Sequence, residues 1–133
     1  MQELWVFEMH LRRNATHEEI ARFVEAAQQA GTLGRIERQN GAAGRRYVLT
    51  CGGCAFQQEL EGADRFEASM DSRERGWRER SIPGLRRCRH FCPKCLWDMD
   101  LAIRFCLVAA EQGYCDYEEA VDRQLASWTA GNP

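Results

Sequence analysis

The chain has 133 residues, of which 44% are hydrophobic and 29% are charged, and its formal net charge is −2. This composition is that of a folded globular protein and excludes a low-complexity chain. The longest apolar stretch, residues 101–110, contains Arg104 and is too short to span a membrane. Residues 1–10 carry no basic flank or apolar signal core, so we expect a cytoplasmic protein with reduced cysteines.

The first 50 residues predict a β-α-β-β unit. Residues 4–12 (LWVFEMHLR) are rich in β-forming side chains, which predicts a strand. Residues 33–38 and 45–50 flank the turn-rich sequence QNGAAG and predict a hairpin. The second hairpin strand leads directly into Cys51.

A helix is predicted between the first strand and the hairpin. Thr16 and Glu19 have the spacing of a capping box, and Gly31 can end the helix. The apolar side chains expected on one face of this helix are Ile20, Phe23, Val24 and Ala27.

A second helix is predicted in the middle of the chain. Asp64 and Glu67 form another capping box, and Gly76 can end the helix. The expected apolar stripe consists of Ala63, Phe66, Met70 and then Trp77, which continues it into the core.

The C-terminal part of the chain predicts a helical hairpin. Residues 86–91 predict a short strand, and Asp98 is expected to cap an apolar helix that Gly113 stops. A third capping box, from Asp116 to Glu119, starts the last helix. The stripe expected to pack this helix against the preceding one is Tyr117, Val121, Leu125 and Trp128.

Two Cys-x-x-Cys pairs, CGGC at 51–54 and CPKC at 92–95, predict a metal site. A two-residue gap lets both sulfurs of a tight knuckle reach one ion, and Zn²⁺ prefers tetrahedral thiolate ligands. Gly52 and Gly53 suit the first turn because glycine accepts left-handed dihedral angles. We therefore predict one structural Zn²⁺ site whose ligands are Cys51, Cys54, Cys92 and Cys95.

The other cysteines and one histidine are expected to lie outside this site. Cys88 and His90 flank the second knuckle and could replace a ligand. Cys88 is better explained as a small buried side chain, and His90 as a surface residue. Cys106 and Cys115 are expected to pack within the closing helices.

The two knuckles are 37 residues apart, more than a compact zinc ribbon needs, and the predicted middle helix is an insertion between them. The predicted fold is α+β in a single domain over residues 1–133. It consists of a β-α-β-β unit (1–50), a zinc ribbon with a helical insertion (51–95) and a helical hairpin (96–133).

The succession of CGGC, a charged helix ending in Gly76-Trp77-Arg78, and FCPKC resembles a zinc-ribbon pattern of small bacterial and bacteriophage proteins. The resemblance covers residues 51–95. It implies an accessory or regulatory factor, of a kind that phages and mobile elements often encode, and it specifies no activity.

The cysteine pattern argues against an enzyme. A catalytic zinc keeps an open position for water, and four thiolates close it. A zinc deaminase is the remaining enzyme alternative, with His17-Glu18-Glu19 as its His-x-Glu element. However, Pro93 lies inside the second cysteine pair instead of before it, and this alternative leaves Cys51 and Cys54 unused.

Residues 72–90 form a basic segment with seven arginines and one tryptophan, between two acidic stretches. Arginines beside an aromatic ring suit phosphate contact and base stacking, while the competing interpretation is a solvated face partly neutralised by glutamates. The candidate contacts are Arg73, Arg78, Arg80, Arg86, Arg87 and Arg89.

A sequence pI near 5.9 is low for a general DNA-binding domain, and the acidic last helix could meet a basic partner. We therefore expect a zinc-binding adaptor or regulatory protein that modulates or inhibits a host protein or protein–nucleic acid complex, such as a CRISPR-type defence complex. The alternative is direct binding of nucleic acid by the arginine segment. The sequence makes no prediction of the oligomeric state.

Overall fold

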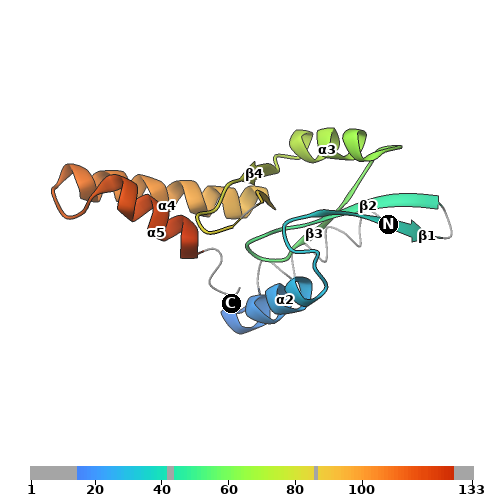
Figure 1. Cartoon of the computed structure of the whole chain (residues 1–133), viewed down its shortest axis with the longest axis horizontal. Helices are drawn as coiled ribbons and strands as arrows, with labels where there is room; N and C mark the ends of the chain where they lie inside the picture. The colour runs from blue at the N-terminus through green and yellow to red at the C-terminus, as the bar shows by residue number, and fades with distance from the viewer. Residues whose placement is uncertain (1–14, 42–43, 86, 128–133) are drawn as a thin grey trace.

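The computed structural model describes residues 15–41, 44–85 and 87–127. As predicted, this part of the chain is α+β (Figure 1). Its helices are α2 (His17–Gln29), α3 (Arg65–Glu74), α4 (Pro93–Glu111) and α5 (Tyr117–Ser127). The predicted strand at residues 4–12 and Trp128 lie outside the described residues. None of the helices in the described ranges has the length and apolar character needed to cross a bilayer.

The larger sheet has three antiparallel strands in the order β1-β2-β3, with bounds Ile36–Gly41, Gly44–Thr50 and Gln57–Leu60. The predicted hairpin is confirmed, with Ile36 opposite Leu49. β3 was not predicted because QQEL has a single apolar residue and no alternation. Pairing with β2, which sets Leu60 opposite Tyr47, makes this segment a strand.

The smaller sheet pairs β4 (Arg78–Arg80) with β5 (Arg89–Phe91) in antiparallel register, so that Arg78 lies opposite Phe91. The sequence predicted β5 but not β4. The segment RER carries no apolar residue, and its strand conformation depends on β5, which follows it only after a loop.

Side-chain caps start three of the helices as the sequence predicted. The Oγ1 atom of Thr16 accepts a hydrogen bond from the Glu19 amide at the start of α2. The aspartates that precede α3 and α5 do the same for Glu67 and Glu119. Gly31, with φ of +73°, follows the end of α2. Local capping chemistry therefore determines these boundaries.

The predicted start of α4 is wrong. The helix begins at Pro93, with Cys92 as its N-cap, five residues before Asp98. Proline suits the first helical position because it lacks the amide hydrogen that would have no partner there, and its fixed φ matches a helix. Gly113, with φ of +80°, follows the end of this helix as predicted.

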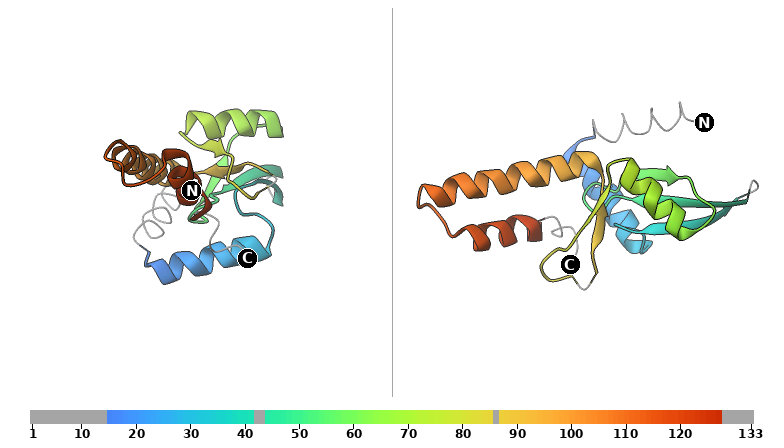
Figure 2. Two further views of the ribbon diagram at one scale, coloured as in Figure 1. Left: turned by 60° about the vertical axis from the view of Figure 1, so that its left-hand side comes forward. Right: turned by 90° about the horizontal axis from the view of Figure 1, so that it is seen from above.

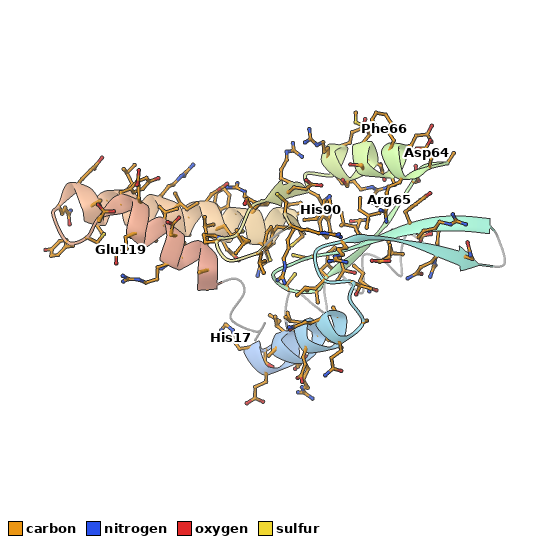
Figure 3. All side chains as sticks on the ribbon, viewed as in Figure 1. His17, Asp64, Arg65, Phe66, His90 and Glu119 are labelled. Atoms are coloured by element: carbon orange, nitrogen blue, oxygen red, sulfur yellow. The ribbon has the colours of Figure 1, made fainter. Side chains whose placement is uncertain are left out.

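The predicted face of α3 is also wrong. Phe66 and Met70 are 74% and 49% exposed, while Ala68 and Ser72 are buried. Figure 3 shows Phe66 on the side of α3 away from the sheet and Arg65 on the side toward it. The small side chains of Ala68 and Ser72 let α3 lie close to the larger sheet. Trp77 is in the core as predicted. It does not continue a buried stripe, because Phe66 and Met70 are exposed.

The core lies where the two sheets meet the first turns of α4. Phe56 and Trp77 stack at its centre, with ring centroids 6.1 Å apart. α2 and α3 lie on opposite sides of the larger sheet (Figures 1 and 2). α4 and α5 project from this body as an antiparallel pair, as predicted (Figure 1). The core side chains are Ile36, Tyr47, Leu49, Cys51, Phe56, Leu60, Ala68, Trp77, Ile82, Phe91, Cys92, Cys95, Leu96 and Met99.

Candidate metal centre

The fold brings the four cysteines of the two knuckles together. Their Sγ atoms all lie within 4.8 Å of one another, and the Sγ atoms of Cys54 and Cys92 are 3.8 Å apart. Two sulfurs on a tetrahedral zinc ion with ordinary Zn–S bonds are separated by about 3.8 Å. The cluster is compatible with a bound metal ion, and the predicted meeting of the four residues is confirmed.

The first knuckle follows β2 as a tight turn. The Cys51 amide donates to Phe56 O, and the Ala55 amide donates to Cys51 O. The left-handed residue of this turn is Ala55, with φ of +60°, so the expectation that Gly52 and Gly53 provide the left-handed conformation is wrong. The Gly53 amide donates to the Cys51 sulfur at 3.3 Å. This contact favours a thiolate at Cys51.

Gly52 is needed for close packing. A Cβ atom on Gly52 would lie 3.0 Å from Arg89 Cβ and 3.3 Å from His90 O. Without that atom, β5 approaches the knuckle and His90 O accepts a hydrogen bond from the Gly52 amide. The His90 amide in turn donates to Gly34 O. The cysteine cluster therefore lies at the junction of the two sheets.

The second knuckle forms the start of α4. Cys92 is the N-cap, and its amide donates to the Cys51 sulfur at 3.3 Å. Cys95 lies in the first turn, where the positive end of the helix dipole favours thiolates. Gly76 packs against this turn, since a Cβ atom there would lie 3.2 Å from Pro93 Cγ. The glycine that ends α3 thus contacts the proline of the second knuckle.

The four thiols affect one another's ionisation. Burial raises the pKa of Cys51. Hydrogen bonds with Cys51 and the other two thiols lower the pKa of Cys92, and the same kind of contact raises the pKa of Cys95. Four thiolates crowded in a buried space would repel one another, and a divalent cation among them would remove that repulsion.

The residues near the second knuckle do not join the cluster. Cys88 is exposed, contrary to the expectation that it is buried. His90, predicted as a surface residue, is partly buried: its Nδ1 lies 3.1 Å from Gly34 O and its Nε2 lies 3.0 Å from Glu79 Oε1, so both ring nitrogens have partners. Cys106 is buried as expected, whereas Cys115 is exposed, which corrects the expectation that it packs between helices.

The His-x-Glu element of the deaminase alternative is also apart from the cluster. His17 is an exposed residue at the start of α2 (Figure 3). Glu19 acts in the cap of that helix, where its amide bonds to Thr16.

The candidate arginines are divided between different surroundings. Arg80 pairs with Asp100 of α4 at 2.9 Å. The Nη1 atom of Arg78 donates to the backbone carbonyls of Arg73 and Trp77. Arg86 lies outside the described residues. The segment thus includes side chains engaged with the protein itself.

Arg87 and Arg89 lie instead beside arginines that the sequence did not single out. Arg87 lines a hollow of about 330 Å³ together with Arg35 and Arg65, and Arg89 lines the adjoining one. Burial and the charge of Arg35 lower the pKa of Arg89. Arg35 precedes β1 and Arg65 begins α3, so only the packing of α3 and β5 around the sheet brings them together. No local sequence signal could have identified them.

Comparison with protein-family models, curated proteins and solved structures found no match to this chain.

Proposed function

We propose that this chain is a non-enzymatic zinc-binding adaptor or regulatory protein. The buried cluster of Cys51, Cys54, Cys92 and Cys95 carries the proposal, because it lies where two sheets and a helix start meet. Four thiolates fill the tetrahedral shell of Zn²⁺ and leave no position for a reactive water. A zinc ion at this place stabilises the fold, and partners bind the surfaces that the fold presents.

The metal content of freshly purified protein tests the zinc proposal. We expect one Zn²⁺ per chain by native mass spectrometry and elemental analysis, since the cluster supplies a full ligand set. A stoichiometry below about half a zinc per chain would contradict it.

The pH dependence of zinc binding tests the thiolate ligands. Burial raises the pKa of the metal-free Cys51 thiol, so zinc has to displace its proton near neutral pH. Affinity should fall as the pH falls, by about tenfold per pH unit for each displaced proton. Competition with a chromophoric chelator at several pH values measures this slope, and a flat profile would rule out thiolate coordination.

We propose a host protein or protein–nucleic acid complex as the partner. The resemblance of residues 51–95 to phage and bacterial accessory proteins supports this class, with a CRISPR-type complex as one example. Affinity purification from the native host should recover the partner with the wild-type chain and lose it with Cys92→Ser. Equal recovery with both chains would contradict binding by a folded surface.

Direct nucleic-acid binding is the second candidate, and the grouping of Arg35, Arg65, Arg87 and Arg89 favours it. Two glutamates, Glu37 and Glu79, line the first hollow and weaken its attraction for phosphate.

Fluorescence anisotropy with labelled single-stranded and duplex DNA across a salt series tests this candidate. Arg35→Ala and Arg87→Ala should each weaken binding and reduce the salt slope by about one. Arg123→Ala, on the exposed surface of α5, is the matched control and should change neither. A complete lack of binding at low salt would exclude the candidate.

A further inference from the structure

α4 is apolar on two opposite sides, and residues 15–41, 44–85 and 87–127 cover only one of them. Leu96, Met99 and Cys106 are buried against the rest of the chain. On the opposite side, four side chains follow one another at intervals of four, four and three residues, which places them in one stripe. This outer stripe consists of Trp97, Leu101, Phe105 and Val108, which are 66%, 43%, 69% and 50% exposed.

The position of α4 leaves the outer stripe accessible. The helix extends away from the two sheets with α5 beside it (Figures 1 and 2). α5 runs back toward the body, and its Leu125 packs against the core. A contiguous exposed apolar patch normally marks a contact surface, so the outer stripe indicates a missing neighbour.

The charges beside the outer stripe indicate which neighbour fits. Asp100 and Arg104 are one turn apart on the same edge of the helix, and they flank the midpoint between Trp97 and Val108. If a second α4 packs antiparallel about this midpoint, Arg104 of each copy faces Asp100 of the other. Parallel packing would instead place this edge of the two copies on opposite sides of the contact, so neither Asp100 would meet an Arg104.

We propose that two copies of this chain associate through antiparallel packing of their α4 helices along the outer stripe. Trp97 of each copy then packs near Val108 of the other, and Leu101 packs near Phe105. The exposed apolar area of the stripe is on the order of 500 Å² per copy, so a pair buries about 1,000 Å², near the lower bound for a specific interface. The proposal does not depend on the proposed zinc or on an external partner.

The mass of the 133-residue chain, as purified, in solution tests the association. Sedimentation velocity over a concentration series should show a change from 15.3 kDa toward twice that mass. Phe105→Glu should abolish the dimer, because it buries a charge at the contact. Phe66→Glu is the matched control, since Phe66 is 74% exposed, compared with 69% for Phe105, but lies on α3, and it should leave the dimer intact.

Circular dichroism and thermal unfolding of each variant establish that the fold is kept. A wild-type chain that stays at 15.3 kDa throughout would overturn the proposal, and it would mean that another protein or another part of this chain covers the stripe. Equal effects of the two phenylalanine variants would overturn it too.

A charge exchange tests the antiparallel orientation. Asp100→Arg and Arg104→Asp each place like charges opposite each other in a homodimer, so each should weaken association by about tenfold or more. An equimolar mixture of the two variants restores both oppositely charged pairs in a heterodimer. Association in the mixture should therefore be stronger than for either variant alone. A mixture no stronger than the separate variants would refute this packing. Asp100→Arg also loses the contact with Arg80, which the mixture does not restore.

Discussion

The body around the cysteine cluster and the arm formed by α4 and α5 bury their apolar side chains in different ways. In the body, two small sheets and α3 surround Phe56, Trp77 and the four cysteines, which are largely enclosed. In the arm, a long helix is covered along one side, and aromatic side chains such as Phe105 stay exposed. The sheets are too small to enclose a large core, so the cluster is expected to supply stability that packing supplies elsewhere.

The largest expected effect is the loss of the proposed zinc site in the body. Cys92→Ser should abolish zinc binding and the cooperative thermal transition. The substitution removes one of the four proposed ligands. A structural zinc site contributes about 10–16 kcal/mol to the folding of small zinc domains, which is as large as the whole free energy of unfolding of most domains. Differential scanning calorimetry with metal analysis measures this.

The exposed Cys88 provides the control for that experiment. Cys88→Ser should keep both zinc and the transition. A melting curve of Cys92→Ser that matches the Cys88→Ser curve would show that the cluster does not stabilise the body.

A pair of tryptophans compares packing in the two regions directly. Trp77 is 1% exposed, and Trp77→Ala should lower the free energy of unfolding by about 3–5 kcal/mol, because it leaves a cavity in the core. Trp97 in the arm is 66% exposed, and Trp97→Ala should change it by about 0.5 kcal/mol or less in dilute protein. Urea unfolding followed by circular dichroism gives both values. Similar losses in the free energy of unfolding for the two variants would contradict the difference in packing between body and arm.

Two glycines with the same backbone conformation test how closely β5 approaches the segment that precedes β1. Gly34 and Gly31 have φ of +74° and +73°, but a Cβ atom on Gly34 would lie 2.8 Å from Arg89 Cβ, while one on Gly31 meets nothing within 4 Å. Alanine at either position should lower the free energy of unfolding by about 1–2 kcal/mol, because alanine disfavours the left-handed conformation. Gly34→Ala should lower the free energy of unfolding by about 1–3 kcal/mol more than Gly31→Ala, because its Cβ atom overlaps with the Arg89 side chain. Equal losses in urea unfolding would mean that Arg89 does not pack there.

The smallest effect is expected at the ion pair between body and arm. The side chains of Arg80 on β4 and Asp100 on α4 are 33% and 51% exposed. Arg80→Ala should therefore lower the free energy of unfolding by about 1 kcal/mol or less, and added salt should make this loss smaller. Arg123→Ala, which removes a more exposed pair within α5, should have no measurable effect. Unfolding at low and high salt measures the difference. An effect of Arg80→Ala that salt leaves unchanged would indicate lost packing instead of lost charge.

Local signals predicted the features that depend on neighbours in sequence. The capping aspartates and Thr16 form the hydrogen bonds that their spacing implies, and each Cys-x-x-Cys pair places its two sulfurs close together. The prediction of which face of α3 is buried was wrong, because that face depends on which side chains can lie close to the sheet. Phe66 is too large for that contact, and Ala68 fits it.

The sequence by itself determined the α+β class, most helix ends and the four cysteines, because caps, glycines and Cys-x-x-Cys spacing act over a few residues. The tertiary structure decided the pairing of β3 with β2 and of β4 with β5, and the grouping of Arg35 and Arg65 with Arg87. It also decided which side of α4 is left uncovered. These features arise from contacts between segments distant in the chain, where geometry outweighs local propensity.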